Sequence, residues 1–351
     1  MKDKHIKKTT DSQLLELLTA QMKRYVSTSK INVSRHVILK FLFYGVLATI
    51  VYSCLFMVNN LYVFLLCYVA YGFITLLFAF NFSHDLSHNT VFKSRKVNNL
   101  FYILSFTIVG AHAEAWKKRH INSHHYAPNV EGYDSDLKIT KLIRVIPNSE
   151  FYWFHRFQYV YAPIAYMSYS LFWICIKDLV ILFSKDNFRR KKNIKYYASF
   201  CLQKGIYIII TLLLPLLFSQ QMWYAVVFGF LIMHMTLSLF LLFTFFMTHH
   251  VESTLYPTVN KDGLINTSWL MNQIGSSNDM HPFSHIANFI FGGFNNHVAH
   301  HLFPHIHHVH YPKLNKILYK VLIENGITPN QTSYFGGAIS HLRLLKRMGK
   351  A

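Results

Sequence analysis

Charged residues are scarce in this chain. They make up 14% of its 351 residues, whereas 52% are hydrophobic and 17% are aromatic. Acidic residues are the scarcest, because 35 Lys and Arg stand against 15 Asp and Glu, a formal net charge of +20. A composition this apolar excludes an ordinary soluble enzyme and indicates a membrane protein whose basic loops face the cytoplasm. The basic residues flank apolar stretches and no nucleic-acid motif occurs, so we expect the lipid bilayer as a partner and no nucleic acid.

Several sequence motifs are also missing. The four cysteines have no CxxC spacing and lie in or beside apolar stretches, so we expect buried free thiols. No HExxH occurs, which argues against a zinc protease. His234 is the one histidine in the middle of an apolar stretch, whereas a bis-histidine haem site needs two. The basic N-terminus has no apolar core directly behind it, so we expect no cleaved signal peptide.

Histidine, in contrast, is abundant and clustered. Spacings of three or four residues place imidazoles on one face of a helix. Neutral imidazole suits Zn, Cu, Fe and Ni, and eight clustered imidazoles exceed what one ion can take. The sequence therefore predicts a site for two metal ions, assembled from three distant segments. The eight residues are His84 and His88; His120, His124 and His125; and His297, His300 and His301.

The three clusters carry a resemblance to a known family. HDLSH, HINSHH and HVAHH resemble the histidine boxes (HxxxH, HxxxHH and HxxHH) of the integral-membrane fatty acid desaturases. The resemblance runs over residues 82–312 and includes GGFN before the third box and HLFPH within it. It implies that the eight histidines bind two non-haem iron ions and that O2 is the co-substrate. The family also tends to place one more histidine after the last span, for which we expect His249, with His250 as the alternative.

The resemblance also implies an activity and partners. The expected enzyme is an oxidoreductase that acts on paired donors, reduces O2 to water and desaturates a fatty acyl chain carried by CoA or by a lipid. No catalytic residue is expected beyond the metal ligands. Residues 1–36 are too few for a fused haem domain, so the electron donor should be a separate ferredoxin or a cytochrome b5-like protein with its reductase. Front-end desaturases typically carry glutamine where this chain has His297, which puts a front-end double bond in doubt.

Two other functions are compatible with clustered histidines. The same iron core could hydroxylate or ketolate a lipid or a carotenoid, and analysis of the product distinguishes the two reactions. A histidine-rich metal transporter would need polar ligands in the middle of its spans. The predicted spans are almost free of such residues, so a transporter is the more distant alternative.

Apolar periodicity predicts four transmembrane helices, each near the roughly 20 residues that cross a bilayer. We expect them at residues 37–58, 61–82, 204–218 and 223–247. Two further apolar stretches, 100–111 and 156–183, should be interfacial or partly re-entrant, because a crossing by either would separate the histidine boxes. A crossing by 156–183 would also place the basic loop 185–195 outside, against the positive-inside rule.

The predicted fold class is therefore an all-α integral membrane protein. Its four helices form two hairpins, with interfacial helices and a cytoplasmic histidine-rich cap. We divide the chain into a cytoplasmic amphipathic segment (1–36), a membrane desaturase domain (37–312) and a basic cytoplasmic segment (313–351). Both termini and the active site should be cytoplasmic. Within the first segment, residues 11–26 should form a helix at the membrane surface, with Asp11 as its N-cap.

Overall fold

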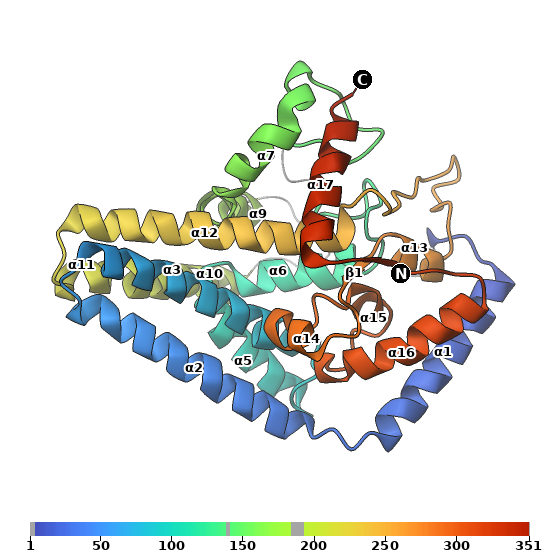
Figure 1. The fold of residues 1–351 in the computed structure, drawn as a ribbon, viewed down its shortest axis with the longest axis horizontal. Helices are drawn as coiled ribbons and strands as arrows, with labels where there is room; N and C mark the ends of the chain where they lie inside the picture. Colours follow the sequence, from blue (N-terminus) through green and yellow to red (C-terminus); the bar gives the residue numbers. More distant parts are fainter. Residues whose placement is uncertain (1–3, 138–140, 184–192, 351) are drawn as a thin grey trace. The chain divides into compact units, whose positions relative to one another are not determined.

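The computed structural model describes residues 4–137, 141–183 and 193–350, which are mostly helical (Figure 1). The predicted basic loop 185–195 lies largely outside these residues. In chain order the elements are α1 (Thr9–Thr28), α2 (Val33–Met57), α3 (Leu61–Phe78), η2 (Ala79–Ser83), α4 (His84–Ser87), α5 (Arg95–Thr107), α6 (Ala113–Arg119), η3 (His120–His124), η4 (Trp153–Phe157), α7 (Gln158–Tyr166), α8 (Tyr169–Phe172), η5 (Trp173–Lys177), α9 (Asp178–Phe183), α10 (Ile194–Ile208), η6 (Ile209–Leu213), α11 (Leu214–Phe218), α12 (Trp223–His249), α13 (Trp269–Gly275), β1 (Asn278–Met280), α14 (His285–Phe291), α15 (His297–Leu302), η7 (His308–His310), α16 (Tyr311–Glu324), β2 (Asn330–Thr332) and α17 (Tyr334–Met348).

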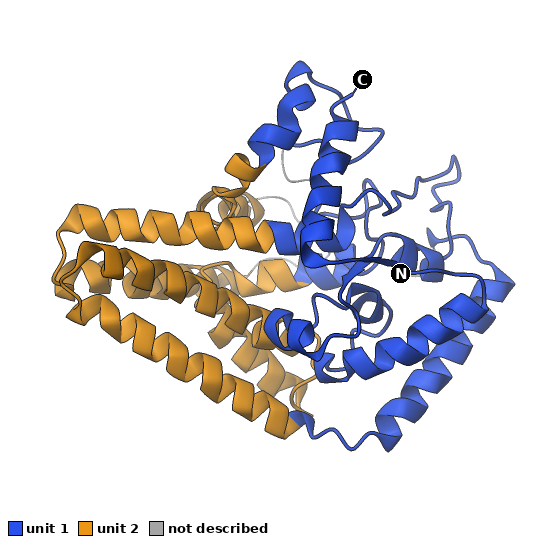
Figure 2. Ribbon diagram, in the orientation of Figure 1, with its two compact units in different colours: residues 1–33, 118–162, 243–351 blue, residues 34–117, 163–242 orange. Residues whose placement is uncertain are grey.

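The chain divides into two compact units, each built from segments far apart in sequence (Figure 2). Unit 1 comprises residues 1–33, 118–162 and 243–351, and unit 2 comprises residues 34–117 and 163–242. Unit 2 holds most of the long apolar helices, whereas unit 1 holds the second and third histidine boxes. The three linear ranges expected from the sequence stay a prediction.

Four helices among the described residues are long and apolar enough to cross a membrane. They cover Val33–Met57, Leu61–Ser87, Ile194–Phe218 and Trp223–His249. Each of the four spans expected from the sequence lies within one of these helices, except that the first was expected to end one residue later. The third starts ten residues earlier than expected, at Ile194 instead of Lys204, and includes Lys195, which belongs to the predicted basic loop 185–195.

The two apolar stretches expected not to cross differ in shape. The first forms α5, whose 13 residues are too short to span a bilayer. The second forms two helical runs, Trp153–Tyr166 and Tyr169–Phe183, which meet at a bend of 73°. Such a bend is compatible with a re-entrant segment and with a broken span. The two-hairpin arrangement therefore stays a prediction.

Within unit 2, a proline breaks the hydrogen-bond ladder of the third candidate span. Pro215 has no N–H to donate to the carbonyl of Thr211, four residues before it. The backbone accommodates this with the π-helical turn η6, and the hydroxyl of Tyr68 on α3 donates to the Thr211 carbonyl at 3.1 Å. Tyr52 on α2 donates to the neighbouring Ile210 carbonyl at 2.7 Å. Hydroxyls from α2 and α3 thus donate hydrogen bonds to two backbone carbonyls, which lipid chains cannot do.

A lysine in the first candidate span is also satisfied within unit 2. Lys40 is 2% exposed, although most of α2 presents apolar side chains outward. Its Nζ donates to Oδ1 of Asn81 at 2.5 Å, and Asn81 lies in the π-helical turn η2 that leads into the first histidine box. Burying an ammonium is costly unless it is hydrogen-bonded. Lys40 therefore fixes α2 to the turn that directly precedes His84.

Asp178 anchors the turn that begins α6, again within unit 2. This buried carboxylate accepts hydrogen bonds from Lys204 Nζ (2.7 Å), the His112 backbone N–H (2.7 Å) and Trp173 Nε1 (3.0 Å). Lys204 also donates to the carbonyl of Gly110 at 2.6 Å. Gly110 has φ +83°, and a Cβ there would lie 2.8 Å from side-chain atoms of neighbouring residues, so only glycine fits. One ion pair thus explains two of the charged residues in otherwise apolar segments, Asp178 and Lys204.

We expect Asp178→Asn to lower the melting temperature of the detergent-purified protein. The substitution removes the negative charge and leaves the Lys204 ammonium, whose side chain is 15% exposed, without its ion-pair partner. Breaking a buried pair from one side costs about 3 to 5 kcal/mol. Glu150→Gln is the matched control, because Glu150 pairs with Lys141 at the surface, where both side chains are exposed. Equal melting temperatures for the two variants would contradict the role of Asp178.

The apolar stripe of α1 packs inside unit 1. Leu14, Leu18 and Met22 are buried in a hydrophobic cluster together with residues of α13, α15 and α16. The expected helix is therefore present, but the face expected to contact the membrane surface instead covers the third-box region. Its N-cap residue is Lys8 and not Asp11, whose Oδ2 accepts a hydrogen bond from Ser268 Oγ at 2.6 Å.

Two further features of the fold differ from expectation. All four cysteines are free as expected, but none is buried: Cys54 and Cys67 are partly exposed, and Cys175 and Cys201 are exposed. Strand β1 pairs in parallel with β2 through the partners Asn278–Asn330 and Met280–Thr332, although the sequence predicted no strand. The pair is only three residues long, and its register fixes the segment just before the third box.

Candidate metal centre

The third box lies on α15, a six-residue helix held at its N-terminus by a buried carboxylate. Oδ1 of Asp279 accepts the Val298 N–H at 2.9 Å, and Oδ2 accepts the Tyr319 hydroxyl at 2.9 Å. Burial raises the pKa of Asp279 to about 7, while these hydrogen bonds act in the opposite direction. Negative charge at this position stabilises a helix N-terminus, where backbone N–H groups lack partners.

Asparagines before the box complete this support. Asn296 Nδ2 donates to Asn288 Oδ1 at 2.9 Å, and its own Oδ1 accepts from Asn315 Nδ2 at 2.6 Å. The backbone carbonyl of Asn295 accepts the Met280 N–H at 2.8 Å, which joins the box to β1. Short helices depend on tertiary contacts of this kind. The orientation of the three histidines on α15 is therefore set by buried polar groups.

The second box forms the π-helical turn η3. In such a turn the backbone N–H bonds to the carbonyl five residues earlier, and the His125 N–H donates to the His120 carbonyl at 2.9 Å. The wider turn brings positions i and i+5 together, so that Nε2 of His125 lies 3.1 Å from Nε2 of His120. A regular α-helix would have paired His120 with His124 instead.

His249 is the last residue of α12, the position at which helix carbonyls lack partners. Asn129 supplies one, because its Nδ2 donates to the His249 carbonyl at 2.9 Å. Asn129 has φ +60° and its backbone N–H donates to Asp134 Oδ2 at 3.0 Å. One asparagine therefore links the end of α12 to the polar turn that follows the second box.

Four histidines from these three segments of unit 1 meet in one buried group. They are His124, His249, His297 and His301, and each places one ring nitrogen within 4.8 Å of those of the others. Nε2 of His249 lies 2.6 Å from that of His297 and 3.2 Å from that of His301. The His297 and His301 nitrogens are 3.1 Å apart.

The outer nitrogens of these rings determine what the inner ones can do. His249 Nδ1 faces the Ser276 carbonyl at 2.7 Å, His301 Nδ1 faces Gln273 Oε1 at 2.9 Å, and His124 Nδ1 faces Asp134 Oδ2 at 3.1 Å. All three partners are acceptors, so in each neutral ring Nδ1 carries the hydrogen and Nε2 carries a lone pair. Converging lone pairs repel one another unless a cation lies between them. The donor set therefore fits a bound metal ion that accepts imidazole nitrogen.

The surroundings keep the ring nitrogens available. Burial lowers the pKa of His297 and of His301 well below the ordinary value, and neighbouring histidines add to this. Neutral imidazole is the form that binds metal. For His124 burial also opposes protonation, but Asp134 outweighs it and raises the pKa. A carboxylate on the outer nitrogen makes an imidazole the stronger base and hence the stronger ligand.

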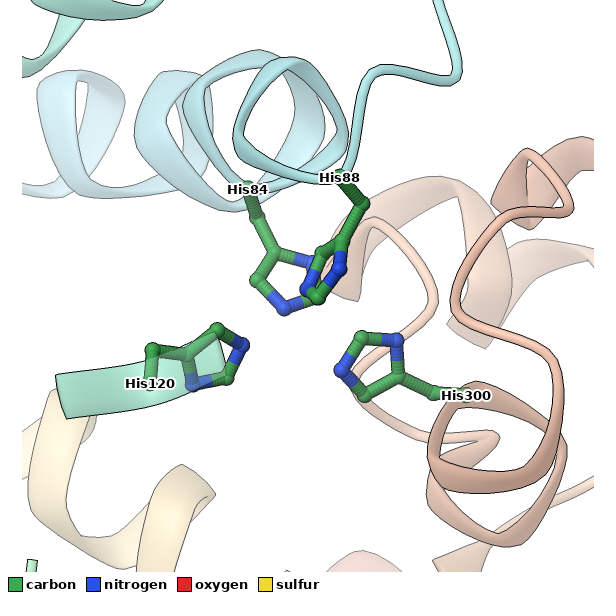
Figure 3. A group of neighbouring side chains, drawn as sticks. All are labelled: His84, His88, His120 and His300. Carbon is green, nitrogen blue, oxygen red and sulfur yellow. The ribbon is translucent and has the colours of Figure 1, made fainter. Parts of the chain in front are cut away.

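The remaining box residues are divided between the two units. In unit 1 the rings of His120 and His300 are nearly parallel with centroids 5.9 Å apart, and the His125 ring lies 4.5 Å from both. In unit 2 His84 and His88 leave the same helical run with ring centroids 5.1 Å apart. Figure 3 shows the His84 and His88 rings extending together from one side of that run, and the His120 and His300 rings.

Several polar residues near the boxes have partners other than the converging ring nitrogens. His250 Nδ1 faces the Tyr256 hydroxyl at 2.8 Å and belongs to no metal-competent group among the described residues. Glu252 is exposed, and Ser340 Oγ donates to it at 3.5 Å. Asn272 and Asn278, which precede the third box, donate to the Pro128 and Met247 carbonyls. Sequence reasoning did not predict a role for Asn129 or Asp134. The signal in the sequence is that both polar residues follow the second box within ten residues.

The comparisons with known proteins agree on one family. The family model described as fatty acid desaturase matches residues 24–333. The sn-1 linoleoyl-lipid 6-desaturase of Arthrospira platensis is 30% identical, over 80% of this chain and 76% of that protein. A Synechocystis protein of the same name is 29% identical, over 78% and 77%. Acyl-lipid (8-3)-desaturase B of Dictyostelium discoideum is 28% identical, over 98% and 77%.

Proposed function

The chain belongs to the fatty acid desaturase family, and we propose that it inserts a double bond into the acyl chain of a membrane lipid at a centre of two iron ions. The observation that carries this is the convergence of Nε2 atoms from three elements of unit 1, each oriented by an acceptor on its outer nitrogen. A bound iron pair would activate O2 to remove hydrogen from an unactivated methylene, using electrons from a separate donor. The residues described above hold and orient its ligands.

The ligand assignment follows the two sets of histidines. One iron takes His124, His249, His297 and His301. The second takes His120 and His300, with His125 beside them, and the family resemblance supplies His84 and His88 as its further ligands. Asp134, Gln273 and the Ser276 carbonyl fix the ring orientations of the first set. A donor set of imidazoles alone suits iron, but it would also accept zinc, so metal identity has to be measured.

The acyl carrier is inferred from the relatives. Several of them are named as acyl-lipid or linoleoyl-lipid desaturases, which supports a lipid-bound acyl chain over acyl-CoA. Their names place the double bond at position 6 or in an 8-3 relation. His297 stands where front-end desaturases typically carry glutamine, which argues against a front-end position for the double bond. The position of the double bond in the product decides between the two.

The test combines metal and product analysis. The chain is expressed in a bacterial host and purified in detergent, its iron and zinc are quantified, and the host lipids are analysed by gas chromatography with mass spectrometry. We expect two irons per chain and a new unsaturated acyl species in the lipid fraction. Hydroxylated lipid with two irons would move the reaction to the alternative chemistry of the same core. Zinc alone with unchanged lipids would overturn the proposal.

The orientation of the chain is proposed from the ends of the helices. Gln221 Nε2 donates to the carbonyls of Val58 (3.0 Å) and Asn59 (2.7 Å), so the turn before α3 and the turn before α12 lie together. Both α3 and α12 start at that end, and each leads to histidines at its other end. This supports two hairpins with all boxes and both termini on the cytoplasmic side.

We expect a label on Gln220 to react from outside the cell. A cysteine at position 220 should be modified by a membrane-impermeant maleimide in whole cells, because the turn lies opposite the histidine ends of α3 and α12. A cysteine at Glu252, which is exposed just after α12, is the control and should react only after the cells are opened. The native Cys175 and Cys201 are replaced by serine beforehand, since both are exposed. Cytoplasmic labelling of position 220 would contradict the four-span arrangement.

A further inference from the structure

The C-terminal helix of unit 1 is packed against a segment nearly 200 residues earlier. Gln158 Nε2 donates to the Leu345 carbonyl at 2.8 Å, and Arg144 Nη1 donates to the Met348 carbonyl at 2.7 Å. Gly349 lies so close to the His155 carbonyl that a Cβ would be 2.5 Å from its oxygen. Buried polar contacts of this kind define a single arrangement, so the start of α7 and the end of α17 form one continuous surface.

That surface exposes large apolar side chains. Trp153 is 73% exposed, Phe157 56% and Val160 58%. They follow one another at intervals of four and three residues along the continuous η4–α7 run, whose first five residues form a 3-10 helix and whose remainder is α-helical. A tryptophan this exposed is unusual in water but common at the interface between lipid and water.

The neighbouring side of α17 exposes cations. Arg343 and Lys346 lie three residues apart on one face of α17, and Lys350 follows the C-cap residue Gly349; all three are exposed. Nζ of Lys346 lies 5.4 Å from the centre of the Tyr159 ring, which joins this face to the η4–α7 run. No Asp or Glu occurs in residues 151–166 or 325–351. Within these two ranges the surface therefore carries apolar and positively charged groups and no acid; of the acids beside them, Glu150 pairs with Lys141 and Glu252 contacts Ser340.

We propose that these six residues form a docking surface for an anionic bilayer, with Trp153, Phe157 and Val160 in the interfacial layer and Arg343, Lys346 and Lys350 on lipid phosphates. Aromatic side chains beside Lys and Arg are the pattern of interfacial helices. An acidic protein partner would match the cations but not the three apolar side chains. The Trp153–Tyr166 run that carries these apolar side chains is itself the first half of the apolar bent pair that ends at Phe183, and the two halves together have the length and hydropathy of a membrane span.

The charge half of the surface is tested by lipid selectivity. The full chain is placed in nanodiscs of phosphatidylcholine and phosphatidylglycerol in equal parts, and electron paramagnetic resonance measures its relative association with spin-labelled forms of the two lipids. We expect R343Q/K346Q/K350Q to lower the preference for phosphatidylglycerol at least about threefold, since each cation near an anionic surface is worth up to roughly fivefold in affinity. The control is K313Q/K316Q/K320Q on α16, three exposed lysines with the same spacing.

The apolar half is tested by fluorescence quenching of the full chain. Brominated acyl chains should quench an emission component that is absent from the Trp153→Phe variant, while Trp269→Phe, in which a partly buried residue of α13 is replaced, should retain it. If iodide in the water quenches Trp153 and bromolipid does not, the surface faces water and the proposal is wrong. An equal loss of selectivity in both lysine and arginine variants would also overturn it. No readout depends on iron or turnover, so failure here is separate from failure of the proposed function.

Discussion

His301→Ala is expected to abolish formation of the unsaturated product and to lower bound iron from two to about one per chain. His301 Nε2 lies 3.2 Å from that of His249 and 3.1 Å from that of His297, so its loss opens the buried group that holds one ion. Gln273 Oε1 orients the same ring, and among the described residues the group would keep only His124, His249 and His297. Product analysis and metal quantification on the purified variant measure both effects.

His305→Ala is the matched control for this prediction. His305 lies four residues further along the same segment, but it is exposed and belongs to no metal-competent group among the described residues. The control variant should keep its iron and its activity. Circular dichroism and detergent solubility should be unchanged in both variants. Wild-type activity in His301→Ala would remove His301 from the essential ligands.

The sequence was sufficient for the parts of the structure that depend on local pattern. The four apolar helices were expected from length and hydropathy, and α1 from its apolar stripe. The packing partner of α1 could not be predicted from the sequence, because a stripe of Leu14, Leu18 and Met22 suits a membrane surface and a protein core equally. The earlier start of the third candidate span was not predicted either, because Lys195 and the basic residues before it in the sequence indicate a polar loop.

The site shows the same division between local and distant causes. The boxes could be recognised from spacing alone, yet helical spacing pairs His120 with His124, whereas the structure pairs its Nε2 with that of His125. That change comes from the π-helical turn, which surrounding contacts stabilise and which no residue type specifies. Asn129 is the clearest omission, since the hydrogen bond from its Nδ2 to the His249 carbonyl joins residues 120 apart in the sequence.

His249→Ala should lose product formation and one iron, whereas His250→Ala should keep both. The sequence left these two neighbours unresolved. In the structure the His249 ring faces the rings of His297 and His301, and its outer nitrogen is held by the Ser276 carbonyl. The next residue along turns its ring away and stacks on Tyr256, with centroids 5.9 Å apart.

The two substitutions should therefore change different properties of the protein: His250→Ala its thermal stability, and His249→Ala its metal binding. Without the His250 ring the Tyr256 hydroxyl loses a hydrogen bond worth about 1 kcal/mol, which a lower melting temperature would report. Without the His249 ring the melting temperature of the metal-free protein should change little or rise, because converging lone pairs no longer repel. Metal content, product and melting temperature measured on both variants separate a ligand from a packing residue. Iron loss in His250→Ala, with iron retained in His249→Ala, would reverse the assignment and require a different partner for the third-box histidines.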